Sequence, residues 1–534
     1  MALAVFSPPN LTLNTLNTLA FTAICLYGFF LIFIFFYSLV QLNLAIQFVK
    51  KNKRKRQMPV IAEEDLPYVT VQLPVFNEMY VIERLINAVC EFDYPRNRLE
   101  IQVLDDGNDE SVEIAAKLIE EKQKLGIDIQ HIRRVDRKGF KAGALAYGLD
   151  ISKGEFTAIF DADFVPRKDF LRQTIPYFYA GEKIAVVQTR WEHLNEDYSL
   201  LTRLQAFGLD AHFTVEQIGR NYSNHYINFN GTAGVWRKEA IYDAGGWQSD
   251  TITEDLDLSY RAQLVGWNFI YLPAIGSPSE LPAEMNALKA QQFRWTKGAA
   301  ECTRKNLGKV LKAKDMGFAH KVHASFHLMN SVVFLSILGT SILSMPMLFI
   351  KHYFDGWHTY NGEHLNDYSV YFAVASAFLV SFFILGFFYW VSRPPMPFFQ
   401  KFGRFVIDFP LFLAVSMGLS LHNAVAVIEG LTGKKSAFVR TPKFAISTGK
   451  KGTWTDKKYR APKISPLTIL EFFMLIYFAS GLVWPFILTW SERDPISNKI
   501  NWEFTDFGLM PFHLMLTIGY FYVTYYSVKH AKAN

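Results

Sequence analysis

The chain has 534 residues, of which 50% are hydrophobic and 16% aromatic, and its formal net charge is +6. This length exceeds that of one ordinary domain, and the aromatic content is high for a soluble protein. The three cysteines, Cys25, Cys90 and Cys302, show neither the spacing of a metal site nor that of a disulfide framework, so we assign them no redox role.

The first predicted element is an apolar segment from about residue 16 to residue 49. It is too long for a signal peptide, no positive residue precedes it, and no small-residue cleavage site follows it. We therefore expect an uncleaved membrane span with its amino terminus outside. The basic run Lys50–Arg56 follows directly. Such a run can be a solvated tail or a nucleic-acid patch, but its place beside an apolar span favours a positive-inside anchor and no nucleic-acid partner.

The middle of the chain has the pattern of an α/β domain. Helical patterns at 81–91 and 111–125 lie between short β-branched runs. These runs are expected strands at 68–73, 99–104, 127–132, 156–160 and 184–188. Alternating strands and helices predict a mostly parallel sheet, in which ligands bind outside the carboxyl ends of the strands.

Four later stretches are long and apolar enough to cross a bilayer, at about 324–350, 368–392, 466–490 and 507–528. A fifth, 404–430, contains Asp408, His422, Asn423 and Glu429. The following segment, 431–465, carries ten Lys or Arg against one Asp and is expected in the cytoplasm, whereas the loops 351–367 and 491–506 are net acidic and are expected outside. Five crossings place every loop on its expected side of the membrane only if 404–430 does not cross, so we expect it to be an amphipathic interfacial helix.

Two other amphipathic stretches, 198–218 and 284–312, would pack the α/β domain against the membrane. The alternative is that both are ordinary surface helices of that domain.

Acidic motifs follow two of the predicted strands. Asp161 and Asp163 flank one small residue, and alternate side chains of an extended segment share a face, so both can reach one ion. Their hard oxygen ligands suit Mg²⁺ or Mn²⁺ with a diphosphate. Asp105 and Asp106 end the second strand, although Asp106-Gly107 alone would suit a turn.

Two further segments offer groups for a nucleotide. Glu78 follows the first strand and lies where it can face a base or ribose. Lys141, in Lys138-Gly139-Phe140-Lys141-Ala142-Gly143, offers a cation and small neighbours for a diphosphate, although the segment is not a Walker loop.

Transfer of a sugar also needs a base for the acceptor hydroxyl. Asp255 in Thr253-Glu254-Asp255 is our candidate, with Glu254 and Asp257 as alternatives. The same residues would suit a helix amino terminus with Thr253 as its cap.

A last motif is Gln291-Gln292-Phe293-Arg294-Trp295. On a helix, Gln291, Arg294 and Trp295 share a face. The arginine can pair with a diphosphate and the tryptophan can stack on a sugar ring. An Arg-Trp belt at a membrane surface is the alternative.

With these motifs in this order, the chain resembles the processive glycosyltransferase family two enzymes, which include cellulose synthases, cellulose-synthase-like mannan and glucan synthases, and hyaluronan synthases. The resemblance covers nearly the whole chain. It implies an A-type glycosyltransferase α/β domain inserted between transmembrane helices, with amphipathic interfacial helices.

The resemblance also assigns roles to residues. Asp105 and Asp106 would hold the nucleotide, Asp161 and Asp163 the nucleotide and metal, and Asp255 would be the base. Three α-helical residues would bind the diphosphate and the end of the glycan: Gln291, Arg294 and Trp295. An acceptor-contact stretch would contain Asn230, Gly231 and Thr232, with Asn230 where cellulose synthases have a cysteine.

The segment Phe438-Val-Arg-Thr-Pro-Lys443 resembles the family's gating loop and places Thr441 and Lys443 near the diphosphate. The order of residues differs slightly from that of bacterial cellulose synthases. No cyclic-di-GMP domain or cysteine-rich domain is expected, so the layout is closest to that of compact mannan or glucan synthases.

The expected organisation is a transmembrane helix (1–50), a cytoplasmic catalytic domain (51–283), interfacial helices (284–323), two transmembrane helices (324–400), an interfacial helix with the gating loop (401–465) and two transmembrane helices (466–534). We expect a multi-pass protein of a bacterial inner membrane, or of the Golgi in a eukaryote.

The expected activity is inverting, processive synthesis of a β-linked glucan or mannan, with β-1,4 linkage. The donor would be UDP-glucose or GDP-mannose, and the enzyme would move the growing polysaccharide through its own spans. The alternatives are a non-processive glycolipid glucosyltransferase resembling ceramide glucosyltransferase, and a channel or transporter with an inactive domain.

Overall fold

The computed structural model describes residues 12–51, 57–181, 183–354, 359–360, 363–435, 440–447, 454–455, 457–459, 464–491 and 507–532. Several predictions fall outside these ranges. They are most of the basic run Lys50–Arg56, most of the acidic loop 491–506, part of the loop 351–367, and Phe438 of the expected gating loop.

A seven-stranded sheet forms the α/β domain, in the order β3-β2-β1-β4-β6-β5-β7. The strands are β1 (Val69–Val75), β2 (Leu99–Asp105), β3 (Ile129–Ile132), β4 (Phe156–Ile159), β5 (Ile184–His193), β6 (Gly234–Arg237) and β7 (Asn268–Ser279). All five expected strands are present, and β6 and β7 are additional. Only β6 runs antiparallel to its neighbours, β4 and β5, so the sheet is mostly parallel, as predicted.

The register of the sheet brings the chemical motifs to one edge. Val75 at the end of β1 pairs with Asp105 at the end of β2, and Gln72 of β1 pairs with Ile159 at the end of β4. The segments that follow these three strands therefore leave the sheet side by side. Buried strand residues such as Val71 and Ile101 hold this edge in place because they pack in the core below it.

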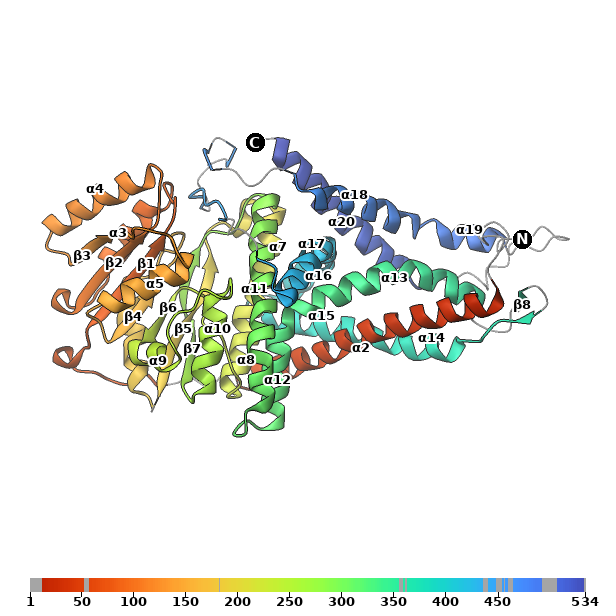
Figure 1. The fold of residues 1–534 in the computed structure, drawn as a ribbon, viewed down its shortest axis with the longest axis horizontal. Helices are drawn as coiled ribbons and strands as arrows, with labels where there is room; N and C mark the ends of the chain where they lie inside the picture. Colours follow the sequence, from red (N-terminus) through yellow and green to blue (C-terminus); the bar gives the residue numbers. More distant parts are fainter. Residues whose placement is uncertain are drawn as a thin grey trace.

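Helices cover both faces of the sheet (Figure 1). They include α3 (Ile82–Cys90), α4 (Ser111–Lys124), α5 (Phe140–Ile151), α6 (Phe170–Thr174), α9 (Lys238–Asp243) and α10 (Glu254–Leu264). In α3 the apolar residues Ile82, Leu85, Ile86 and Val89 are all buried. Their three- and four-residue spacing gives the helix the apolar stripe that packs on the sheet.

A second set of helices lies between the sheet and the rest of the chain. The stretch expected at 198–218 forms α7 (Leu200–Ala211), a π-helical turn (His212–Glu216) and α8 (Gln217–Tyr222). The stretch expected at 284–312 is α11 (Met285–Lys312), followed by α12 (Phe318–Leu328). Figure 1 shows α11 standing across the end of the sheet, with the apolar helices on its other side.

Within the described ranges, four helical segments are long and apolar enough to cross a membrane: Leu13–Lys50, Phe318–Phe354, Ser369–Ser392 and Pro466–Trp490. They comprise α2 (Leu13–Lys51), α12 with α13 (Val333–Phe354), α14 (Ser369–Ser376) with α15 (Val380–Ser392), and α18 (Pro466–Ser480) with α19 (Trp484–Ser491). The helix α20 (Met510–Lys532), expected to be a further span, is not one of these four. The orientation of the spans stays a prediction.

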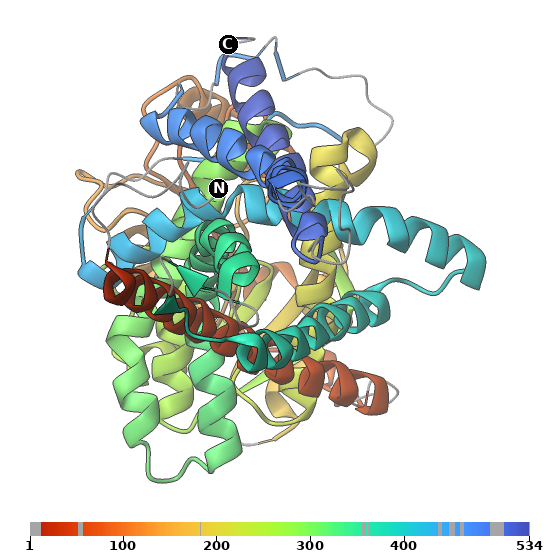
Figure 2. The same ribbon diagram turned by 90° about the vertical axis from the view of Figure 1, so that its right-hand side faces the viewer.

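The segment expected as one interfacial helix, 404–430, is instead a bent pair. α16 (Phe398–Gly418) and α17 (Ser420–Thr432) meet at 51°, and together they would make a fifth span if they cross as one. The bend lies where Gly418 packs so closely on α20 that an added Cβ would come 2.3 Å from the carbonyl oxygen of Gly519. Figure 2 shows α16 reaching to one side of the bundle, and its first turns expose Phe398, Phe399 and Phe402.

Candidate active site

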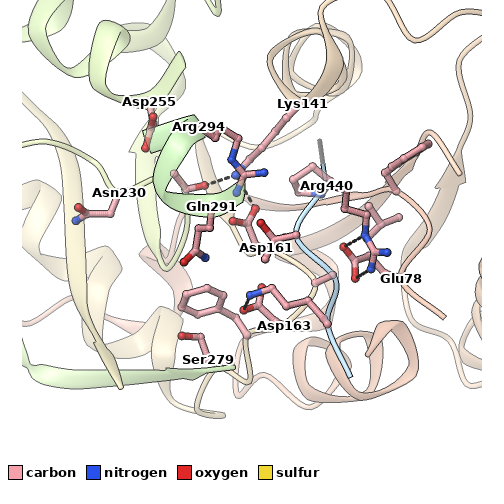
Figure 3. A pocket seen from close by; sticks show the side chains of 18 of the residues that line it. Glu78, Lys141, Asp161, Asp163, Asn230, Asp255, Ser279, Gln291, Arg294 and Arg440 are labelled. Carbon is pink, nitrogen blue, oxygen red and sulfur yellow. Dashed lines mark hydrogen bonds and ion pairs between the residues drawn. The ribbon is translucent and has the colours of Figure 1, made fainter. Parts of the chain in front are cut away.

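A cavity of about 220 Å³ opens at the carboxyl edge of the sheet, below α10 and α11 (Figure 3). Most of the residues singled out from the sequence line it. They are Glu78, Asp106, Lys141, Asp161, Asp163, Asn230, Gly231, Glu254, Asp255, Gln291, Arg294, Trp295, Thr441 and Lys443. The chain thus brings together residues that are as much as 365 positions apart (78 to 443).

Two of the predicted residues lie behind the cavity. Asp105 is 2% exposed: one carboxylate oxygen accepts a hydrogen bond from the backbone N–H of Gly107 at 2.7 Å and the other contacts Nε2 of His131 at 2.8 Å. Thr232 accepts a hydrogen bond from the backbone N–H of Asp161 at 2.9 Å. Both therefore hold cavity segments in place, and neither lines the cavity, which differs from their expected ligand-binding roles.

Two of the cavity carboxylates, Asp161 and Asp163, each pair with a lysine. Nζ of Lys141 lies 2.5 Å from Asp161 and 2.8 Å from the carbonyl oxygen of Gly231. Nζ of Lys443 lies 2.7 Å from Asp163. Burial acts to lower the pKa of Lys141, but Asp161, Glu254 and Asp255 together outweigh it and the pKa is raised, so the lysine stays charged.

The same pattern continues at the ends of β1 and β2. Nε of Arg440 donates to Glu78 at 3.0 Å, and Nε of Arg134 donates to Asp106 at 3.0 Å. Burial raises the pKa of Glu78 to about 7, even though Arg440 acts to lower it. The carboxylates at this edge therefore face cations that a bound ligand could also contact.

Asp161 and Asp163 suit a divalent metal that is shared with a ligand. They supply hard oxygen donors at the end of β4. Within the part of the chain that the structure describes, no group of three or more His, Cys, Asp or Glu residues is placed to hold a metal ion. Mg²⁺ or Mn²⁺ at this position would therefore need diphosphate oxygens and water to complete its coordination.

Asp255 and its neighbour Glu254 form the first turn of α10. Burial, with the charge of Glu254 second, raises the pKa of Asp255 to about 7, and burial also raises the pKa of Glu254. A carboxylate with a pKa near 7 suits a general base at neutral pH. Thr253 takes the cap position but makes no capping hydrogen bond; its hydroxyl contacts Sγ of Cys302 at 3.4 Å.

The alternative base Asp257 points away from the cavity. Its carboxylate accepts hydrogen bonds from Nδ2 of Asn306 at 2.9 Å and Nε of Arg261 at 2.8 Å. Although burial acts to raise its pKa, Arg261 and Asn306 outweigh it and the pKa is lowered. Asp257 therefore ties α10 to α11 and does not line the cavity.

Gly231 approaches both Asp255 and Lys141. Its φ is +77°, and a Cβ there would lie 3.0 Å from Oδ2 of Asp255 and 3.5 Å from Nζ of Lys141. The loop thus needs a glycine for its backbone conformation and for the space it leaves around the base.

Gln291, Arg294 and Trp295 of α11 all line the cavity, as their helical spacing predicts. Burial lowers the pKa of Arg294, while Asp161 and Glu254 act to raise it. The ring of Trp295 lies 6.5 Å from that of Trp191, centroid to centroid. An arginine and a pair of indoles thus face the space between Asp161 and Asp255.

Other lining residues were not identified from the sequence. They include Phe76, Arg137, Trp191, Ser279 and Arg440. The guanidinium of Arg137 lies 3.3 Å from the centre of the Phe76 ring. Arg440 lies within the motif Phe438–Lys443, so its positive charge was a signal in the sequence that could have identified it. Ser279 ends strand β7, which was not predicted, so no such signal marked it in the sequence.

Residues 67–298 match the model of a family described as glycosyltransferase like family 2. The chain is 42% identical over 281 residues to glucomannan 4-beta-mannosyltransferase 1 of Oryza sativa subsp. japonica, covering 52% of this chain and 54% of that protein. It is 42% identical over 295 residues to glucomannan 4-beta-mannosyltransferase 2 of Arabidopsis thaliana, covering 53% and 55%. The chain spans about half the length of the curated relatives it matches.

Among solved structures, the chain is similar to the mannosyltransferase PcManGT from Pyrobaculum calidifontis in complex with GDP-Man and Mn²⁺. The identity is 16% and the TM-score 0.50, over 77% of this chain and 100% of that one. This similarity concerns the fold alone and confirms the expected A-type glycosyltransferase architecture.

Proposed function

We propose that the chain, whose residues 67–298 match the glycosyltransferase like family 2 model, is an inverting, processive hexosyltransferase that builds a β-1,4-linked mannan or glucan at a membrane. The observation that carries the proposal is the cavity shared by Asp255, Arg294, Asp161 and Asp163. It combines a base with a pKa near 7 and a set of charges suited to a leaving diphosphate.

In this proposal the donor diphosphate lies between Arg294, Lys141 and the loop of Asp161 and Asp163. A bound Mg²⁺ or Mn²⁺, held by Asp161 and Asp163, would supply positive charge to the diphosphate. Arg294 and Lys141 add fixed positive charge beside it, so negative charge that develops on the leaving group is stabilised.

Asp255 takes the proton from the acceptor hydroxyl. The hydroxyl oxygen then bonds to the anomeric carbon while the bond from that carbon to the diphosphate oxygen breaks, and the electron pair leaves with the diphosphate. Because attack and departure occur on opposite faces, one displacement inverts the anomeric configuration. Trp295 and Trp191 offer apolar faces on which the sugar rings of the acceptor can stack.

GDP-mannose is the proposed donor, with UDP-glucose as the alternative. The named activities of the Oryza and Arabidopsis relatives and the GDP-Man ligand of PcManGT support mannose. The four apolar segments support a bilayer as the site of synthesis, with the catalytic domain in the cytoplasm and the Golgi as location if the source is eukaryotic.

Purified protein in nanodiscs, given radiolabelled GDP-mannose or UDP-glucose with Mg²⁺ or Mn²⁺, tests the proposal. We expect high-molecular-weight label from one donor that a β-1,4-mannanase or β-1,4-glucanase digests. Asp255→Asn should abolish it, and the exposed Asp243→Asn should serve as the matched control. A small organic-soluble product would contradict the polymerase and support the glycolipid enzyme. Undiminished product from Asp255→Asn would contradict the assigned base.

A further inference from the structure

Two buried lysines lie on the side of α11 that faces away from the catalytic cavity. Lys289 is 4% exposed and Lys297 is fully buried. They are eight residues apart with Phe293 midway, a spacing that puts all three on one side of the helix. Gln291, Arg294 and Trp295 line the catalytic cavity instead, and Figure 3 shows Gln291 and Arg294 there.

Lys289 joins α11 to two helices of the apolar bundle. Its Nζ lies 2.7 Å from Oε2 of Glu471 and 3.3 Å from the hydroxyl of Thr468, both on α18, and 3.4 Å from the hydroxyl of Ser527 on α20. Glu471 is fully buried. Nε2 of His422, on α17, is 3.1 Å from the carbonyl oxygen of Lys289.

Lys297 joins α11 to α17 two helical turns further on. Its Nζ contacts Oε2 of Glu429 at 3.2 Å and the carbonyl oxygen of Lys434 at 2.5 Å. The helices touch closely here, because a Cβ at Gly430 would lie 2.5 Å from the carbonyl oxygen of Lys297. Between the two lysines, the ring of Phe293 packs on that of His422 at 5.3 Å, centroid to centroid.

Packing alone does not fill this side of α11. A cavity of about 770 Å³ borders Lys289, Phe293 and His422, and it shares Lys141, Glu254 and Arg294 with the catalytic cavity. Fewer apolar contacts hold α11 where it borders this cavity, so polar contacts matter more there for its rotation and axial position. Buried ion pairs contribute little net stability compared with apolar residues of the same size, but they can specify one register.

We propose that Lys289–Glu471, supported by Lys297–Glu429, fixes the rotation and axial position of α11 and so positions Arg294 and Trp295 for transfer. The lysines and glutamates are positioning residues that act through α11. The bundle helices α17 and α18 thereby set the geometry of the diphosphate and acceptor contacts. This inference rests on the proposed function.

The double variant Lys289→Met/Glu471→Met tests the proposal, because it removes both charges and leaves no buried charge unpaired. We expect a melting temperature near that of the wild type, while Lys289→Met alone lowers it. The double variant should lose on the order of tenfold in kcat, because small displacements of reacting groups are costly. Donor KM should change less, since Asp106, Lys141 and Asp161 come from other elements.

Hydrogen exchange gives a second readout that needs no turnover. Peptides covering 287–297 should exchange faster in the double variant, while peptides from α4 should not change. Lys309→Met is the matched control, because Lys309 is an exposed lysine near the other end of α11. It should alter neither kcat nor exchange at 287–297.

If the double variant keeps the kcat of the wild type and its hydrogen exchange at 287–297, the proposal is overturned. The ion pair would then do no more than an apolar contact does. A folded wild-type protein that transfers no sugar from either donor would count against the proposed function instead. The exchange difference at 287–297 would still be measurable in that case, so the two failures can be told apart.

Discussion

Ion pairs between lysines and carboxylates lie on both sides of α11, but the two sets differ in their access to solvent. In the catalytic cavity, the Lys141 and Asp161 side chains are 25% and 36% exposed, and those of Lys443 and Asp163 are 11% and 10% exposed. Behind α11, the side chains of Lys289 and Glu471 are 5% and 0% exposed. An accessible pair can exchange its partner for a diphosphate or a metal, whereas a pair with almost no solvent-exposed surface mainly holds its helices together.

Replacing the base should have the largest effect on the accessible side. We expect Asp255→Asn to reduce turnover by about 10³-fold, within the range that proton transfer by a positioned group contributes. The melting temperature should not fall, because the change removes a buried carboxyl without removing an ion pair. Initial rates and a thermal melt measure the two effects. If the melting temperature of Asp255→Asn fell together with its transfer rate, the result would contradict a catalytic role for Asp255.

Removing divalent metal should affect only the accessible side. Chelation with EDTA should lower the transfer rate on the order of 100-fold, since a metal contributes several kcal/mol to charge stabilisation at a phosphoryl group. Added Mn²⁺ or Mg²⁺ should restore it, and hydrogen exchange of α11 behind the cavity should stay the same. Full activity in EDTA would exclude Asp161 and Asp163 as ligands of a required metal.

The pH dependence should report the accessible carboxylates. The pKa of Asp255 is raised to about 7, so below pH 7 the group is protonated and cannot accept a proton. Turnover should therefore rise with pH through 7 and fall about tenfold per unit below it. Glu78→Gln is the useful control, because the pKa of Glu78 is also raised to about 7. A flat profile of kcat between pH 5.5 and 8.5 would contradict Asp255 as the base.

A smaller effect is expected from Thr232→Val, which keeps the shape of a side chain behind the cavity. It removes the acceptor for the backbone N–H of Asp161, and an unsatisfied buried donor costs about 1–3 kcal/mol. We expect a lower free energy of unfolding and a severalfold lower rate at low metal concentration that excess metal partly restores. Thr232→Ser retains the hydroxyl and should behave as wild type; equal defects in both variants would rule out the hydrogen bond as the cause.

Local rules explain why most of the predicted site residues lie together in one cavity. Strand ends gather at one edge of a parallel sheet, which brought Asp106, Asp161 and Asp163 together, and helical spacing put Arg294 and Trp295 on one face. These rules did not predict that Asp105 lies behind the cavity. Neighbouring residues at a strand end face opposite ways, and only the register decides which of them faces the cavity.

Other parts of the fold could not be predicted from local pattern. β7 contains Pro273, Gly276 and Pro278, which are unfavourable in a strand, and its pairing with β5 has a register shift between Thr189 and Arg190. The pair Lys289–Glu471 joins residues 182 positions apart, and neither hydropathy nor spacing relates them. The bend between α16 and α17 likewise lies where Gly418 contacts Gly519, which is 101 residues further along the chain (519 − 418).

The reversed direction of β6 has one more consequence. Because β6 runs against β4 and β5, the chain enters this strand at the edge where the parallel strands end. Asn230 and Gly231 therefore reach the cavity from the start of a strand, while Asp161 and Asp163 reach it from the end of another. In the proposed function, the segments that contact the acceptor and the donor therefore belong to separate connections. Insertions before β6 would then change which glycan end is recognised, while the carboxylates proposed to face the donor keep their framework.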